Sequence, residues 1–259
     1  MINKIDTPRD HPSKPDNVYL YGTCVLDLFD PEAGMSALEL MELEGITVHF
    51  PQAQTCCGQP AYTSGFPEEA RAVAAKQIPL FEKDWPIVVP SGSCAGMMKH
   101  HWPKLFAEDP VLAPLANSIS ARVFELTEFL LNVAKVDWSK TKVSDKVVLH
   151  TSCSARREMN THINANALLK QLKGIEVLEQ DHESECCGFG GAFAIKHPEI
   201  SAAMASDKVD ALEATGANVM ISADGACLLN INGTLEKRQS SLKGQHIATY
   251  LLSVTKDEK

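Results

Sequence analysis

Short apolar runs alternate with longer amphipathic segments along the whole chain. In the first half, residues 18–21, 46–50 and 87–89 form short runs rich in β-branched side chains, which is typical of buried strands. Segments 32–44 and 68–85 lie between them with the apolar spacing of helices, and Gly45 marks the end of the first one. Strands that alternate with helices of this length predict a parallel sheet with helical crossovers.

The second half repeats this pattern. Short apolar runs recur at residues 147–149, 175–178 and 219–222, and helical segments at 164–173 and 198–215, which end at Gly174 and Gly216. Residues 18–24 align with 147–153, and residues 125–133 resemble 246–254. The order is kept throughout, so the chain is a duplicated unit.

The duplication predicts an α/β protein of two pseudo-symmetric repeats, each a mainly parallel sheet flanked by helices. We expect a first domain over residues 17–134 and a second over residues 146–254, joined by a polar stretch. Residues 1–16 are polar and contain three prolines, so we expect them to form a disordered tail.

Eight cysteines fall into the duplicated unit, four in each half, and each half has two adjacent cysteines followed by glycine. They are Cys24, Cys56, Cys57 and Cys94 in the first half, and Cys153, Cys186, Cys187 and Cys227 in the second. Each follows a predicted strand, and the carboxyl ends of parallel strands meet at one edge of a sheet. Adjacent thiolates suit a soft metal, so we predict that each set of four holds a metal centre.

Four glycines accompany the paired cysteines: Gly58, Gly188, Gly190 and Gly191. A glycine lets backbone N–H groups approach the sulfurs of a bound cluster, so we interpret these glycines as part of a cofactor site. A plain tight turn is the alternative interpretation. Four histidines, His101, His150, His182 and His246, are interpreted as surface or core residues, although His150 lies only three positions before Cys153.

Composition narrows the classes of function. The chain has 259 residues and a formal net charge of −9, without a Lys/Arg cluster, which argues against a nucleic-acid partner. We expect no transmembrane segment, because no apolar run is long enough, and a cytoplasmic location, because no secretory signal is visible. In a reducing compartment, clustered cysteines indicate metal or redox chemistry rather than disulfides. No dinucleotide fingerprint or hydrolase triad is visible, so no catalytic residue is assigned.

Four motifs carry a resemblance to a known family: Cys-Cys-Gly-Gln-Pro-Ala-Tyr at 56–62, Pro-Ser-Gly-Ser-Cys at 90–94, Cys-Cys-Gly-Phe-Gly-Gly-Ala-Phe at 186–193, and residues 198–205. From residue 17 to 254 the chain resembles the lactate-utilisation protein A family. Its cysteine-rich CCG domain is shared with heterodisulfide reductase and with the iron–sulfur subunit of glycolate oxidase. The resemblance implies an iron–sulfur electron-transfer subunit, with clusters such as 4Fe-4S. It further implies two partner subunits, one of them an iron–sulfur protein, in a complex that oxidises L-lactate to pyruvate.

The sequence departs from the full CCG motif, which ends in Cys-x-x-Cys. Met97 and Asn230 stand where the last cysteine of each half would be, so the five-thiolate cluster of heterodisulfide reductase is not carried over. Four thiolates suffice for one ordinary iron–sulfur cluster or for tetrahedral zinc. Three interpretations stay open: a redox subunit with one cluster per half, which we favour, a zinc-stabilised scaffold, and a thiol–disulfide reductase-type subunit.

Overall fold

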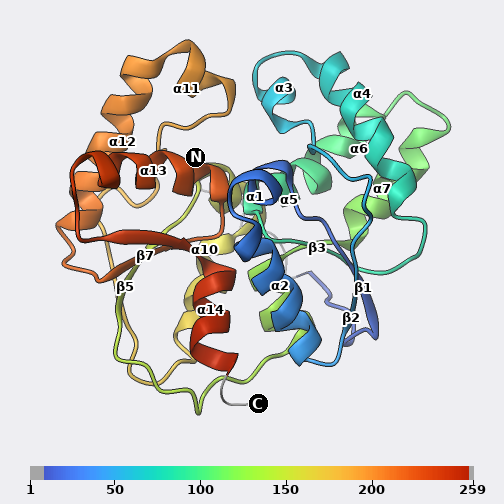
Figure 1. Cartoon of the computed structure of the whole chain (residues 1–259). Coiled ribbons are helices and arrows are strands. Elements are labelled where there is room, and N and C mark those ends of the chain that lie inside the picture. Colours follow the sequence, from blue (N-terminus) through green and yellow to red (C-terminus); the bar gives the residue numbers. More distant parts are fainter. Residues whose placement is uncertain (1–8, 257–259) are drawn as a thin grey trace.

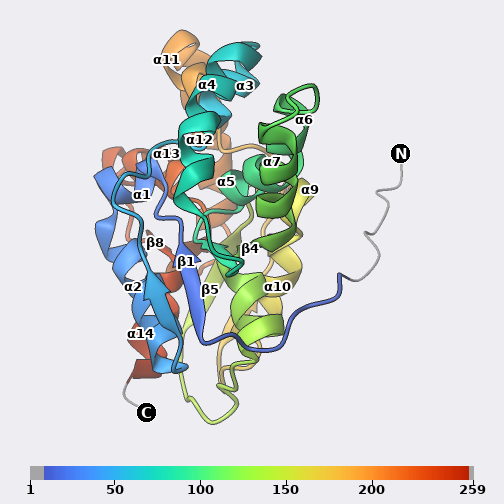
Figure 2. The ribbon, with the colours of Figure 1, turned by 90° about the vertical axis from the view of Figure 1, so that its right-hand side faces the viewer.

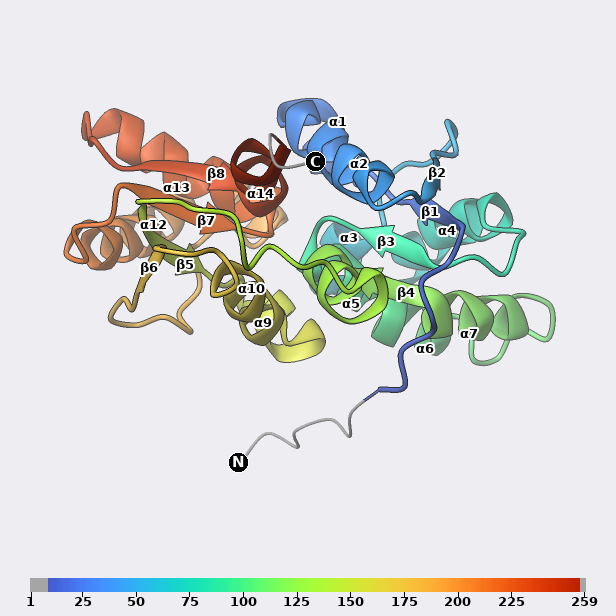
Figure 3. The same ribbon diagram turned by 90° about the horizontal axis from the view of Figure 1, so that it is seen from below.

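The computed structural model describes residues 9–256. Two halves lie side by side, each built on a four-stranded sheet of parallel strands (Figure 1, Figure 3). The first sheet has the order β2-β1-β3-β4, and the second has the equivalent order β6-β5-β7-β8. The strands are β1 (Asn17–Leu20), β2 (Thr47–His49), β3 (Ile87–Val89), β4 (Val123–Glu125), β5 (Lys146–His150), β6 (Glu176–Leu178), β7 (Val219–Ser222) and β8 (Lys243–His246).

Helices connect and flank the strands of both sheets. Those of the first half are α1 (Cys24–Phe29), α2 (Pro31–Leu43), α3 (Gln59–Thr63), α4 (Pro67–Gln77), η1 (Ile78–Leu80), α5 (Gly92–Gly96), η2 (Met97–His101), α6 (Trp102–Leu105), α7 (Leu112–Arg122), α8 (Leu126–Glu128) and η3 (Phe129–Ala134). Those of the second are α9 (Cys153–Met159), α10 (Thr161–Leu169), α11 (Ala192–Lys196), α12 (Pro198–Glu213), α13 (Gly225–Lys237) and α14 (Ile247–Thr255). Helices α3 and α11 lie at the same end of the molecule (Figure 2).

Alternate residues of each central strand enter different cores. Val18 and Leu20 of β1 point into a core that both halves share, whereas Tyr19 and Tyr21 pack against the outer helices of the first half. In the second half, Val148 of β5 packs against α12 and α13. A strand with both faces buried reads as a continuous apolar run, which is the reason for the pattern seen in the sequence.

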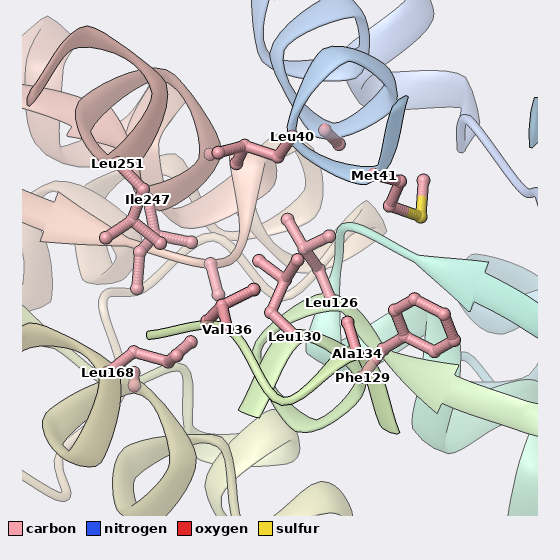
Figure 4. Packing of buried hydrophobic residues seen from close by; sticks show 14 of the residues in the cluster. Leu40, Met41, Leu126, Phe129, Leu130, Ala134, Val136, Leu168, Ile247 and Leu251 are labelled. Carbon is pink, nitrogen blue, oxygen red and sulfur yellow. The ribbon is translucent and has the colours of Figure 1, made fainter. Parts of the chain in front are cut away.

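The shared core joins the halves through equivalent helices. Leu40 of α2 and Leu251 of α14 lie on one side of it, and Leu130 of η3 and Leu168 of α10 on the other (Figure 4). Helix α14 packs on α2, and α10 packs on α8 and η3. Helix α5 likewise packs on α9, and α1 on α13. The halves therefore contact each other through the same elements twice, as expected for a pseudo-symmetric duplication.

The predicted fold class is confirmed, and every predicted strand and helix is present. Two strands were missed: β4 and β8, the fourth strand of each sheet. The predicted helix 68–85 was too long, because α4 ends at Gln77 and Pro79 in η1 cannot donate a helical hydrogen bond. Within residues 9–256, no helix combines the length and the apolar character needed to cross a membrane.

The segment before β1 runs along the first half. Residues 1–8 of the expected disordered tail lie outside the described residues. Arg9 donates a 2.8 Å hydrogen bond to the carbonyl oxygen of Val123, and its guanidinium lies 3.7 Å from the ring centre of Phe124. Glu128 accepts a 3.4 Å hydrogen bond from Arg9, and His11 lies 3.2 Å from the same carboxylate. Arg9 and His11 thus contact β4 and α8.

Candidate metal centre

All eight cysteines line one cavity of about 290 Å³ between the two halves. Cys24 and Cys153 begin α1 and α9, Cys94 lies in α5 and Cys227 lies in α13. The adjacent pairs follow β2 and β6 in loops: Cys56 with Cys57, and Cys186 with Cys187. The structure therefore brings both sets of four to a single space, onto which the carboxyl edges of both sheets open. That the two sets share one cavity was not anticipated from the sequence.

The four thiols of the first half interact with one another. Cys24 and Cys57 donate hydrogen bonds to Cys56, and these bonds lower the pKa of Cys56 to about 3. The pKa of Cys24 is raised, first by its hydrogen bond to Cys56 and then by burial. The pKa of Cys57 is raised by its hydrogen bonds to Cys56 and Cys94 and by burial. Without a cation, negative charge therefore concentrates on Cys56, and the thiol forms of Cys24 and Cys57 are favoured.

The second set forms a similar chain of thiols. The pKa of Cys153 is raised, first by its hydrogen bond to Cys186 and then by burial. The bond from Cys153 lowers the pKa of Cys186, but a bond to Cys187 and burial outweigh it, so that pKa is raised. In Cys187 the bond from Cys186 lowers the pKa, but its bond to Cys227 and burial raise it well above the ordinary value. None of these three thiols is favoured as a thiolate without a positive ion.

Glycine follows each cysteine pair because the loop turns back on its first sulfur. The N–H of Gly58 donates to the Sγ of Cys56 at 3.4 Å, and the N–H of Gly188 donates to the Sγ of Cys186 at 3.4 Å. Both glycines have left-handed backbone conformations, with φ of 90° and 83°. A Cβ atom on Gly58 would lie 2.9 Å from the carbonyl oxygen of Ala70. These two positions thus require glycine, and they aim backbone dipoles at sulfur.

The other two predicted glycines shape the cavity wall. Gly190 and Gly191 line the cavity and have positive φ values of 52° and 61°. A Cβ on Gly191 would come within 3.6 Å of Pro60 in the first half. The glycine-rich loop of the second half therefore closes against the loop of the first cysteine pair.

The positions of the missing fifth cysteines have other roles. Met97 is fully buried in the outer core of the first half. Asn230 donates a 2.7 Å hydrogen bond from Nδ2 to the carbonyl oxygen of Cys187. The equivalent bond in the first half comes from Trp102, whose Nε1 donates to the carbonyl oxygen of Cys57 at 2.9 Å. Both halves thus fix the cysteine-pair loop by a side-chain donor, and each offers four thiols.

A buried carboxylate links the halves beside the cavity, and sequence reasoning missed it. Oδ1 of Asp224 accepts hydrogen bonds from the Ser91 hydroxyl at 2.8 Å and from the Ser93 hydroxyl at 2.7 Å. Both serines belong to the first half, and all three residues line the cavity. Burial raises the pKa of Asp224. The only signal for Asp224 in the sequence is its place three residues before Cys227.

The candidate histidines differ in their surroundings. His150 is buried, and one of its ring nitrogens lies within 4.8 Å of the Sγ atoms of Cys187 and Cys227. Neither ring nitrogen has a hydrogen-bond partner among the described residues, and burial lowers the pKa of His150 to about 3. His246 is also buried, but its Nε2 lies 2.9 Å from the carbonyl oxygen of Pro90, so it is a satisfied core residue.

The remaining histidines and the two arginines after Cys153 lie farther from the sulfur atoms or have other partners. Nε2 of His101 lies 3.2 Å from Glu158. His182 is exposed and forms a 3.0 Å ion pair with Glu185. Arg156 pairs with Glu183 at 2.8 Å, whereas Arg157 lines the cavity. Of these residues, only Arg157 and Glu158 reach the cavity wall.

The donors fit a soft metal. Each half presents four thiols within one hydrogen-bonded chain, and thiolate sulfur is the preferred ligand of iron–sulfur clusters and of structural zinc. The unpartnered nitrogens of His150 add a further orphan donor beside the second set. The residues that could hold a metal are Cys24, Cys56, Cys57 and Cys94 in the first half, and Cys153, Cys186, Cys187 and Cys227 in the second.

Comparison with known proteins agrees with the duplicated architecture. The family described as Cysteine-rich domain (CCG) matches the chain twice, over residues 18–99 and 147–232. The chain is 42% identical over 235 residues to Lactate utilization protein A 2 of Bacillus cereus (strain 03BB102), covering 90% of this chain and 97% of that protein. It is 40% identical over 237 residues to Lactate utilization protein A of Shouchella clausii (strain KSM-K16), covering 92% and 99%.

Among solved structures, a hypothetical protein from Helicobacter pylori shares the fold with a TM-score of 0.63 at 10% identity. The match covers 95% of this chain, which spans only 50% of that protein. The duplicated cysteine-rich units, the paired cysteines at equivalent sheet edges and the identity with these relatives lead to one assignment. The chain belongs to the lactate utilization protein A family and consists of two cysteine-rich CCG units.

Proposed function

We propose that this chain is the iron–sulfur redox subunit of a cytoplasmic system that oxidises L-lactate to pyruvate. Two partner subunits, one of them an iron–sulfur protein, would complete the system. The observation that carries the proposal is the convergence of two equivalent sets of four thiols on one cavity. The names of the relatives support lactate utilisation as the process.

The arrangement suits electron transfer between two centres. Oxidation of L-lactate to pyruvate releases two electrons and two protons, and iron–sulfur clusters accept and donate electrons singly. The two thiol sets face each other across the cavity, so that electrons passing between them stay within the interior of the chain. The electrons would leave to the partner iron–sulfur protein, and the protons to water.

The residues of this chain control the environment of the centres. The N–H groups of Gly58 and Gly188 point at cysteine sulfur and stabilise negative charge there. Trp102 and Asn230 hold the carbonyl groups of the cysteine pairs, which fixes the direction of the thiols. Cys57 and Cys187 are buried, so water has little access to these sulfurs. Fixed donors and restricted water access are the means by which a protein tunes cluster potential.

Anaerobic purification followed by metal and sulfide analysis tests the proposal. We expect a brown protein that contains iron and acid-labile sulfide, and whose visible absorption bleaches when L-lactate is added with the partner subunits. Cys57→Ser and Cys187→Ser are matched variants, because each removes one buried thiol at equivalent positions of the two halves. Each should lower the iron content without abolishing it.

Two other results would replace the proposal. A colourless protein with stoichiometric zinc would indicate a structural scaffold, which four tetrahedral thiolates also suit. A metal-free protein that reduces disulfides would indicate thiol chemistry, for which the low pKa of Cys56 is the appropriate property. An iron-containing protein whose visible absorption does not bleach with L-lactate and the partner subunits would contradict the role in lactate oxidation but not the metal site.

A further inference from the structure

The two halves differ at one position next to their thiols. Tyr21 follows β1, and His150, the last residue of β5, occupies the equivalent place, three residues before the first cysteine of its half. The Tyr21 hydroxyl donates a 2.6 Å hydrogen bond to the carbonyl oxygen of Thr55 and is satisfied. Within residues 9–256, the ring of His150 has no such partner. At this equivalent position, the first half therefore has a hydroxyl that is hydrogen-bonded, and the second half has an imidazole whose nitrogens are not.

His150 is buried, so a ring nitrogen without a hydrogen-bond partner destabilises the folded state. The residue is 1% exposed, and a void of about 10 Å³ beside it is lined by apolar side chains such as Leu149 and by polar ones that include Thr151 and Asp224. Lys208, whose charge acts on the His150 ring, donates instead to the carbonyl oxygen of His182 at 2.6 Å and to Gln180 at 3.4 Å. A buried polar atom without a hydrogen-bond partner is destabilising, and the described residues supply no partner for the His150 ring.

The atoms around His150 are arranged so that a metal ion could be the missing partner of its ring nitrogen. A ring nitrogen of His150 and the Sγ atoms of Cys187 and Cys227 all lie within 4.8 Å of one another. Ligands of one tetrahedral ion with bonds of about 2.0–2.3 Å lie roughly 3.3–3.8 Å apart, so small side-chain shifts bring the three atoms to ligand distance. Among the residues that the structure describes, no other group of three candidate ligands, whether histidine, cysteine or carboxylate, meets this distance criterion.

We propose that His150 is a ring-nitrogen ligand of the second-half centre, together with Cys187 and Cys227. This inference rests on the proposed metal binding by the second set of cysteines. It also supplies an additional donor in the half where Asn230 stands in place of a fifth cysteine and donates to the Cys187 carbonyl instead. The first-half centre is bound by thiolates alone.

The consequence is a difference between the two centres. A ligand present in only one half would make the two centres inequivalent, and ligand identity is one of the means by which a protein sets the reduction potential of an iron–sulfur centre. The two centres would therefore differ in reduction potential.

Pulsed EPR on protein labelled with ¹⁵N-histidine tests the ligand directly. When its centres are brought to a paramagnetic state, the wild-type protein should show ¹⁵N coupling on one of the two centres. His150→Ala should lose this coupling and shift the potential of that centre, while the other centre is unchanged. His182→Gln is the matched control, because His182 is an exposed histidine in the same half. It should keep both the coupling and the potential. If the bound metal is zinc, X-ray absorption at the zinc edge should show a nitrogen ligand that only His150→Ala removes.

The outcomes separate this inference from the proposed function. Metal in both halves with no histidine nitrogen coupling in the wild-type protein would overturn the assignment of His150 and leave the metal sites in place. Absence of metal from the wild-type protein would overturn both. Because the decisive spectrum is that of the wild-type protein, a variant that fails to fold does not prevent the test.

Discussion

Gly188→Ala tests how tightly the loop of the second cysteine pair is confined. Gly188 has a φ of 83°, and a Cβ atom there would lie 2.6 Å from the carbonyl oxygen of Ser201 and 3.0 Å from the Cβ of Met204. A left-handed conformation costs an L-residue about 1–2 kcal/mol. Displacing the start of α12 adds about 1–3 kcal/mol, the range found for overpacked sites. We therefore expect a loss of about 2–5 kcal/mol in the free energy of unfolding.

Gly216→Ala is the matched control for this substitution. Gly216 has a φ of 70°, and no atom lies within 4 Å of the position that its Cβ would take. Only the conformational cost applies, so we expect a loss of about 1–2 kcal/mol. Equilibrium urea unfolding of the metal-free proteins gives both values, and metal analysis of the native proteins shows whether Gly188→Ala alone impairs the second centre. Equal losses in the two variants would refute the proposed contact between the cysteine loop and α12.

Three further predictions concern buried groups other than the cysteines. Glu125 is wholly buried and burial raises its pKa from 4.5 to about 8. The folded state thus keeps a proton that the unfolded state releases, and stability falls by up to about 5 kcal/mol as the pH rises from 4.5 to 8. Glu125→Gln should flatten that profile in urea unfolding, and an unchanged slope would contradict the burial argument. Asp224→Ala removes the acceptor of the Ser91 and Ser93 hydroxyls and should lower the free energy of unfolding in urea by about 1–3 kcal/mol. Asp224→Asn keeps an acceptor oxygen and should lower it less. Equal losses in the two variants would contradict a stabilising hydrogen bond between the halves at this position. Leu130→Ala should cost about 2–5 kcal/mol and keep a single calorimetric transition, because the core around Leu130 belongs to both halves; two separate transitions would show that the halves unfold independently.

Local sequence patterns were sufficient to predict the parallel sheets and the placement of the cysteines. Buried parallel strands are short apolar runs, and ligands that follow them meet at the carboxyl edge whatever their separation in sequence. Strand β8 was missed because its residues, Lys-Gly-Gln-His, contain no apolar run. It is a strand because of its pairing with β7, which places Met220 beside Gly244. Pairing of that kind is tertiary information.

The missed parts of the site depend on tertiary packing. Asp224 is significant only because Ser91 and Ser93 of the other half donate to it. His150 lies close to Cys153 in the sequence, but its proximity to Cys187 and Cys227 depends on how β5, the loop after β6 and α13 are arranged within the second half. The single cavity is also a property of the interface between the halves, and no motif within one repeat encodes it.

We propose that each of the two sets of four cysteines at the shared cavity holds a metal centre independently of the other set. The most direct measurement is the metal content per chain of anaerobically purified wild-type protein, of Cys57→Ser, of Cys187→Ser and of the double variant. We predict that each single variant retains about half of the wild-type metal, since one intact four-thiolate set remains, and that the double variant retains none. A metal-free wild-type protein, or a single substitution that empties both halves, would contradict the claim.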